Sequence, residues 1–161
     1  MVEISKTKTF KLIFLISIIA LASAFFIEYI LGHQPCNLCI LERIPYLLAL
    51  IIIVLNYKFI NLEKYFILSL ILIFLAATII SLYHLGIEQG YIEESLVCDL
   101  KNGSNLLTKE DILKQLQEKN VSCKDVTFKI LGLSHTSYNI IISILIVYFT
   151  TKTYLSYDKN K

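Results

Sequence analysis

The stretch Tyr65–Leu85, YFILSLILIFLAATIISLYHL, decides the fold class, because it contains no Asp, Glu, Lys or Arg. A membrane-spanning helix needs about 20 mostly apolar residues. Three further stretches have the same character, namely Leu12–Leu31, Ile44–Phe59 and Ser134–Thr150. The apolar runs do not alternate with a period of two, so helices are expected rather than barrel strands. The sequence therefore predicts an all-α membrane protein, a four-helix bundle that forms a single domain over residues 1–161.

The composition agrees with this assignment. The chain has 161 residues, of which 56% are hydrophobic and 17% are charged, and its mean hydropathy is +0.66. Soluble domains carry roughly 25% charged residues, so this chain has too little polar surface for a water-soluble globule. Its hydrophobicity excludes a disordered chain. A net charge of +2 argues against a nucleic-acid-binding protein, and five glycines and two prolines exclude collagen-like or proline-rich sequence.

The first apolar stretch has a second interpretation, as a cleaved signal peptide. Lys6, Lys8 and Lys11 form a basic segment before it, and Ala22-Ser23-Ala24 resembles a signal-peptidase site. However, the apolar run continues to Leu31, which a cleaved signal peptide does not need. A retained membrane helix is therefore the favoured interpretation.

The placement of lysines predicts the orientation, because short cytoplasmic loops of membrane proteins are enriched in Lys and Arg. Both termini are then expected in the cytoplasm, with loops 32–43 and 86–133 on the opposite side of the membrane. Lys124 and Lys129, near the fourth stretch on that opposite side, depart from the rule. The lysines that set the orientation are Lys6, Lys8, Lys11, Lys58, Lys64, Lys152, Lys159 and Lys161.

All four cysteines fall in the two loops that are expected outside the cytoplasm. Cys36 and Cys39 form a C-x-x-C in the short loop, and Cys98 and Cys123 lie in the long loop. An even number of cysteines in an oxidising compartment indicates disulfides. Sequence alone leaves three pairings open, of which one bridge per loop is the natural resting state. A Cys₄ zinc site is a further alternative, although the second pair lacks the C-x₂₋₄-C spacing of such sites.

The C-x-x-C and Arg43 have the spacing of a redox site. A C-x-x-C is often redox-active, whereas a bridge across the long loop could be a structural staple. Arg43 follows Cys39 by four residues, so the two share one face if a helix begins here. The guanidinium would favour the thiolate and stabilise charge on a carbonyl oxygen of a bound acceptor. The alternative is an arginine that marks the membrane interface and extends to the lipid headgroups.

At Pro35–Arg43, which reads P-C-x-L-C-x-x-E-R, the sequence resembles the disulfide bond formation protein B (DsbB) family. Two further stretches resemble its alphaproteobacterial branch, namely Tyr83–Gly90, and Gly132–Ser134 followed by Tyr138-Asn139. The resemblance spans essentially the whole chain. The family often has proline near its fourth cysteine, where this chain has Val121-Ser122, and this chain contains no tryptophan. These departures bear on partner contacts and loop geometry more than on the reaction.

The resemblance implies a quinone-coupled thiol oxidase in the bacterial inner membrane, with its cysteine loops in the periplasm. A reduced DsbA-like thiol oxidase of thioredoxin fold would attack Cys98 of a Cys98–Cys123 bridge and leave oxidised. Cys123 would then exchange with Cys36. Cys39, at the membrane edge, would pass the electrons to ubiquinone or menaquinone, with Arg43 beside it.

Further candidates are polar residues near the ends of the apolar stretches. His84 could contact the quinone headgroup or relay a proton, or it could be an interfacial or capping group. Glu42 is a candidate for the quinone site, as a partner of Arg43, or it faces water. Glu28 is a weaker candidate. Two other histidines are expected to be interfacial, namely His33 and His135.

A short helix is expected within the long loop, from Thr108 to about Lys119. Thr108 has the character of an N-cap, with Asp111 at the third position. Three apolar residues would then share one face, namely Ile112, Leu113 and Leu116. The pattern predicts a helix that lies on the membrane surface or one that packs on the rest of the loop.

Two other functions are compatible with four membrane spans. A non-catalytic scaffold with disulfide-stapled outer loops, as in tetraspanins, would carry a C-C-G motif in its large loop, and none occurs here. An enzyme of the vitamin K epoxide reductase type shares the four-helix quinone chemistry, but its C-x-x-C lies late in the chain. A C-x-x-C followed by Arg43 at the start of the second stretch favours the thiol oxidase.

Overall fold

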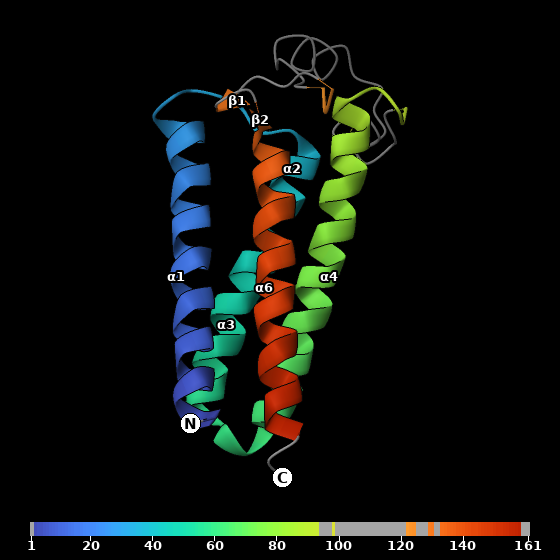
Figure 1. The fold of residues 1–161 in the computed structure, drawn as a ribbon. Helices are drawn as coiled ribbons and strands as arrows, with labels where there is room; N and C mark the ends of the chain where they lie inside the picture. Colours follow the sequence, from blue (N-terminus) through green and yellow to red (C-terminus); the bar gives the residue numbers. More distant parts are fainter. Residues whose placement is uncertain (1, 94–97, 99–121, 125–128, 131–132, 159–161) are drawn as a thin grey trace, which may run out of the picture.

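The computed structural model describes residues 2–93, 98, 122–124, 129–130 and 133–158. Its main elements are four long helices that run side by side (Figure 1), namely α1 Val2–Tyr29, α3 Ile44–Lys58, α4 Glu63–Glu88 and α6 His135–Asp158. Four helical segments are long and apolar enough to cross a membrane. The predicted all-α four-helix membrane bundle is therefore confirmed, and the chain is a multi-pass membrane protein.

The helices extend beyond the predicted apolar stretches at several of their ends. The stretch 65–85 lies inside α4, α6 continues beyond Thr150, and α1 begins before Leu12 but ends before the predicted Leu31. Hydropathy locates the part of a helix that contacts lipid, whereas the backbone hydrogen-bond ladder continues into the polar flanks. After α1, Gly32 has a φ of 72°, the left-handed conformation that commonly ends a helix.

The second span consists of a short helix, α2 Asn37–Leu41, followed by α3, with Glu42 and Arg43 between them. Pro45 explains the break, because proline has no N–H to donate to the carbonyl group four residues earlier. Part of the predicted short loop is therefore a helical turn that contains Cys39. The break places Glu42 and Arg43 at the junction between this turn and the bundle.

The centre of the bundle is apolar and closely packed. Almost completely buried side chains come from all four long helices, namely Ile13, Ala49, Leu70, Phe74 and Ile146. Only about a third of each candidate span is buried inside the protein, although the helices are apolar on all sides. Helices that are hydrophobic all round face either a large core or lipid, and here the exposed apolar surface is the surface for lipid.

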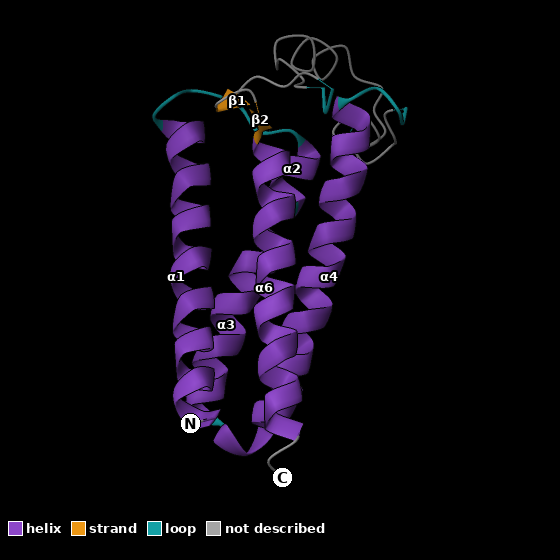
Figure 2. Cartoon of the chain, viewed as in Figure 1, coloured by secondary structure: helices purple, strands orange, loops and turns teal. Residues whose placement is uncertain are grey.

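The two ends of the bundle differ in structure. Both described ends of the chain lie at one end (Figure 1), with η1 Ile60–Leu62 connecting α3 to α4 there. The opposite end, which we call the cysteine end, carries α2 and the antiparallel strands β1 Lys129–Ile130 and β2 Leu133–Ser134 (Figure 2). The hydropathy pattern does not predict these strands. The predicted surface helix from residue 108 to about 119 lies outside the described residues.

Candidate active site

The four cysteines form two disulfides, Cys36–Cys39 and Cys98–Cys123. This is the expected resting pairing, with one bridge per loop. In this state the sulfurs are bonded to one another, so they are not the thiolate ligands that a Cys₄ zinc site requires. The surroundings of each bridge then indicate which chemistry it can support.

The two disulfides share one buried cluster at the cysteine end. One buried cluster contains members of both bridges and two apolar neighbours, namely Cys36, Cys123, Leu38 and Ile87. Cys36 is 5% exposed and Cys123 is 3% exposed. The side-chain amide of Asn37 donates a hydrogen bond of 3.0 Å to the backbone carbonyl of Cys98. Bridges from distant parts of the sequence are therefore adjacent, as disulfide exchange between them requires.

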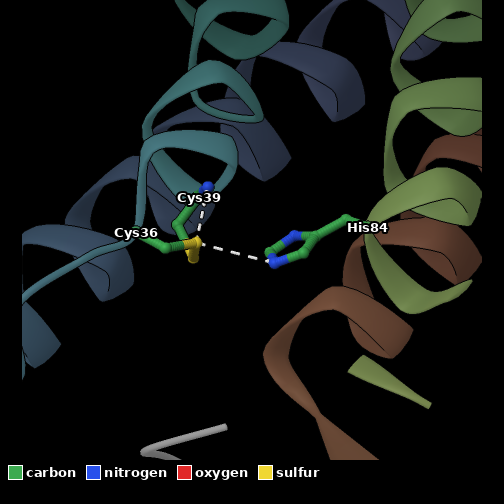
Figure 3. Close-up of side chains that lie close together, drawn as sticks. All are labelled: Cys36, Cys39 and His84. Atoms are coloured by element: carbon green, nitrogen blue, oxygen red, sulfur yellow. Dashed lines mark hydrogen bonds between the residues drawn. A yellow bond between two sulfur atoms is a disulfide. The ribbon is translucent and has the colours of Figure 1, made fainter. Parts of the chain in front are cut away.

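The sulfur of Cys36 makes two polar contacts (Figure 3). The backbone N–H of Cys39 donates to Cys36 Sγ over 3.1 Å, and His84 Nε2 lies 3.5 Å from the same sulfur. Cys36 is the N-cap residue of α2, and His84 comes from α4. Both contacts are suited to a sulfur that gains negative charge when its disulfide is reduced.

His84 is held in place by a carboxylate. It is 1% exposed, and its Nδ1 lies 2.9 Å from Glu42 Oε1. A neutral His84 carries one ring proton: on Nδ1 it is donated to Glu42 and the Nε2 lone pair faces Cys36, whereas on Nε2 it is donated to the Cys36 sulfur. The three side chains are thus arranged as a sulfur, a base and an orienting carboxylate.

Asn139 connects this arrangement to three helices. Its Nδ2 donates to Glu42 Oε2 over 3.1 Å and to Ser81 Oγ over 2.8 Å, and its Oδ1 accepts a hydrogen bond from the Tyr46 hydroxyl. All four side chains are buried, and Asn139, Ser81 and Tyr46 belong to α6, α4 and α3. Buried polar groups are tolerated when they are hydrogen-bonded, so this network fixes the position of Glu42.

A second carboxylate, Glu88, approaches His84 from the same helix. Glu88 Oε1 lies 3.8 Å from His84 Nε2 and accepts a hydrogen bond of 2.6 Å from the Thr136 hydroxyl. Thr136 Oγ1 also lies 3.2 Å from His84 Nδ1. Two acidic side chains therefore surround one buried histidine. Ionisable residues inside membrane helices are energetically costly and usually functional.

Cys39 faces a pocket between α1, α3 and α6. The pocket combines apolar residues of α1 with polar groups near the α2–α3 junction and on α6, including Leu21, Ala24, Cys39, Glu42, Arg43 and His135. His84 is not among the residues that line it, although the sequence suggested a contact with a bound quinone. His84 contacts the sulfur of Cys36, and its contact with a quinone stays a prediction.

Arg43 is held at this pocket by two contacts with α1. Its NH1 group donates a hydrogen bond of 2.5 Å to Glu28 Oε2, and its guanidinium lies 5.3 Å from the centre of the Phe25 ring. The expectation that Glu42 pairs with Arg43 or faces water is wrong, because Glu42 is buried and contacts His84. The two adjacent side chains therefore have different partners, Glu42 with His84 and Arg43 with Glu28.

The structure brings together the five residues that the sequence singled out around the C-x-x-C, namely Cys36, Cys39, Glu42, Arg43 and His84. Sequence reasoning did not identify Glu88, Thr136 and Asn139 as site residues, and it placed His135 at the interface although this residue lines the pocket. The sequence could have indicated Glu88 and Asn139 as site residues, since both are polar residues in the stretches that resemble the family.

Comparison with known proteins decides the family. The family model for "Disulfide bond formation protein DsbB" matches residues 6–152, which is most of the chain. The chain belongs to the DsbB family. The uncharacterized protein RP370 of Rickettsia prowazekii (strain Madrid E) is 34% identical to it over 140 residues, which cover 83% of this chain and 79% of RP370. Membership of the DsbB family implies a membrane thiol oxidase that acts in disulfide bond formation, and it favours redox chemistry over a scaffold role for the disulfides.

Proposed function

We propose that this chain is a quinone-dependent protein-disulfide oxidoreductase, which reoxidises a DsbA-like periplasmic thiol oxidase and passes the electrons to a membrane quinone. One observation carries the proposal: the two disulfides are adjacent, and Cys39 of one of them lines a pocket between the membrane helices. Electron transfer from a soluble dithiol to a lipid-soluble acceptor needs two things: a second disulfide close to the first, and a site for the acceptor beside one of the cysteines.

Each cysteine has a distinct role in this proposal. The thiolate of the partner attacks Cys98, which is half-buried and so more accessible than the buried Cys123. Cys123 leaves as a thiolate, and the second thiolate of the partner then displaces Cys98, so that the partner is oxidised. Cys123 next attacks Cys36, which shares its buried cluster, and Cys39 is released at the pocket. Cys98 then attacks Cys123, which restores the Cys98–Cys123 bridge and releases Cys36.

The residues that line the pocket have the chemistry to bind the headgroup of a quinone. Leu21, Ala24 and Ile142 supply apolar walls for a ring, while Arg43 and His135 supply hydrogen-bond donors for carbonyl oxygens. A bound quinone supplies a lipid-soluble acceptor of two electrons and two protons, and ubiquinone and menaquinone both meet this description. The protein's own contribution is to hold Cys39 and a cation beside that acceptor.

We place the cysteine end in the periplasm and both termini in the cytoplasm of a bacterial inner membrane, with residues 1–161 as one membrane domain. Both described chain ends lie opposite the cysteine end (Figure 1). Lys58 and Lys64 flank the connection between α3 and α4 at that same end, in agreement with the enrichment of lysine in cytoplasmic loops.

The function is tested by mixing the purified chain with a reduced thioredoxin-fold dithiol protein and a quinone, and by following quinone absorbance. Catalysed quinone reduction supports the proposal. A redox-inert scaffold would leave the absorbance unchanged.

Replacement of Arg43 by alanine is expected to raise the KM for quinone about tenfold to a hundredfold, because a hydrogen bond to a charged group contributes about 1.5–3 kcal/mol. Exchange between the two disulfides should stay near the wild-type rate. Lys58→Ala is the matched control, since Lys58 also lies over an aromatic ring, Phe59, but at the opposite end. An unchanged KM in Arg43→Ala would reduce Arg43 to an interfacial anchor.

Replacement of Asn37 by leucine is expected to slow exchange between the two disulfides about threefold to tenfold. The hydrogen bond from Asn37 to Cys98 holds the bridges together, and one such bond contributes about 0.5–1.5 kcal/mol. The measurement is a single turnover, quenched with acid and analysed by alkylation and mass spectrometry. Gln34→Leu, at an exposed amide of the same loop, should leave the rate unchanged, and equal rates in both variants would remove Asn37 from this role.

A further inference from the structure

The site contains a route for protons as well as for electrons, and this inference rests on the proposed thiol-oxidase function. We propose that His84 is the acid–base group of the Cys36 sulfur, and that the Glu42 carboxylate carries the proton between His84 and the pocket that contains Cys39. His84 is then a catalytic residue that contacts a reacting atom.

The contact between His84 and Cys36 is suited to proton transfer. His84 Nε2 lies 3.5 Å from Cys36 Sγ (Figure 3), and Nδ1 on the other side of the ring lies 2.9 Å from Glu42 Oε1. The imidazole therefore has a sulfur on one side and a proton acceptor on the other. All three residues are at most 5% exposed, so bulk water does not compete for the proton.

Glu42 joins the buried histidine to the pocket. Its Oε1 contacts His84 and its Oε2 accepts a hydrogen bond from Asn139. Glu42 also lines the pocket together with Cys39, whereas His84 is not among the lining residues. Within the described part of the chain, Glu42 is thus the group that contacts both His84 and the pocket.

The reaction balances when the reduced C-x-x-C is reoxidised. The S–H bonds of Cys36 and Cys39 break and one S–S bond forms between them, which releases two electrons and two protons. Both electrons go to the quinone of the proposed function, which is the oxidant. The Cys36 proton moves to His84 Nε2, and the proton on Nδ1 moves to Glu42 and into the pocket, where Cys39 releases its own proton. During disulfide exchange Cys98 displaces Cys36 from Cys123. Cys36 leaves as a thiolate and takes the proton from His84 Nε2, and Nδ1 regains a proton through Glu42.

Glu88 is the competing proton acceptor. Its Oε1 lies 3.8 Å from His84 Nε2, on the side of the ring that faces the sulfur, and it accepts a hydrogen bond from Thr136. Thr136 also faces the ring but carries no charge. Glu88 is not among the residues that line the pocket. A proton on Glu88 would therefore not reach the pocket through Glu42. The test has to distinguish the effect of Glu88 from that of Glu42.

The first test measures the acid–base role without quinone. In the full chain with Cys39→Ser, Cys98→Ser and Cys123→Ser, Cys36 is the only thiol, and its alkylation by iodoacetamide is followed against pH. Addition of His84→Gln is expected to move the midpoint of this profile to higher pH. The rate at neutral pH should then fall about tenfold, because a shift of one pH unit changes the thiolate fraction tenfold. A loss of packing alone would change the rate at every pH and leave the midpoint in place, and that result would overturn the proposal. His33→Gln is the matched histidine control and should leave the midpoint unchanged.

The second test separates the carboxylates in the protein with all four cysteines. Glu42→Gln keeps the shape of the side chain, and we expect it to slow quinone reduction about tenfold or more, since a positioned acid–base group contributes about 100-fold to 10,000-fold. We expect Glu88→Gln to change the rate less than Glu42→Gln, and the opposite order would overturn the Glu42 route. If the unmodified protein reduces no quinone, the proposed function fails, whereas the alkylation profile of Cys36 still decides the role of His84.

Discussion

Replacement of Cys39 by serine is expected to abolish multiple turnovers of quinone reduction, with a loss of about a thousandfold or more, as found when one member of a catalytic unit is removed. Cys39 lines the pocket and is bonded to Cys36. Without its sulfur, electrons that reach Cys36 have no thiolate at the pocket. The Cys98–Cys123 bridge should still oxidise one equivalent of the dithiol partner, so a single turnover survives.

Ile40→Ser is the matched control for Cys39→Ser. It introduces the same side chain into α2 at the next position, where Ile40 is exposed, and it should retain wild-type turnover. Both variants are compared by stopped-flow quinone absorbance and by the number of dithiols oxidised per protein. Undiminished multiple turnover in Cys39→Ser would show that electrons leave the protein by another route.

Replacement of Asn139 by leucine is expected to lower the free energy of unfolding by about 2–4 kcal/mol. Interhelical hydrogen bonds in membrane proteins average only about 0.6 kcal/mol each, but a buried acceptor left without its donor costs about 1–3 kcal/mol. Asn139→Leu removes the partner of Glu42, Ser81 and Tyr46 at once. The Glu42 Oε2 oxygen, left without its donor, is therefore the dominant cost.

Asn56→Leu is the control for Asn139→Leu. Asn56 is a buried amide of α3 whose Oδ1 has no hydrogen-bond partner within the described part of the chain. Its replacement by leucine should change stability by less than about 1 kcal/mol, because no bonded partner is left unsatisfied there. Both variants are measured by equilibrium unfolding in mixed detergent and SDS micelles. Equal losses in both would mean that the network around Glu42 contributes nothing specific.

Much of the fold follows from the sequence, because a helix that crosses the bilayer needs a long apolar stretch. Four apolar stretches of sufficient length identify four helices, and continuous hydropathy identifies them more reliably than an amphipathic pattern would. The observed bounds of the second span differ from the predicted ones because of a single residue. Pro45 breaks the second span into α2 and α3, and a hydropathy average does not register one missing N–H.

The candidate site was predictable where it is local in sequence. Cys39 and Arg43, four residues apart, were expected to act together, and both line one pocket. The partners of Glu42 were not predictable, because His84 and Asn139 reach it from α4 and α6. Such contacts depend on how the helices are rotated within the bundle, and helices apolar on all sides carry little sequence signal for that rotation.

The central claim is that electrons pass from a soluble dithiol through both disulfides to a membrane quinone. The most direct measurement is an anaerobic titration of the purified chain and a quinone with a reduced thioredoxin-fold dithiol protein, with quinone absorbance and free thiols followed together. One quinone should be reduced for each dithiol oxidised, over many turnovers per protein. Oxidation that stops when the protein's own disulfides are consumed, with the quinone unchanged, would rule out electron transfer to the quinone.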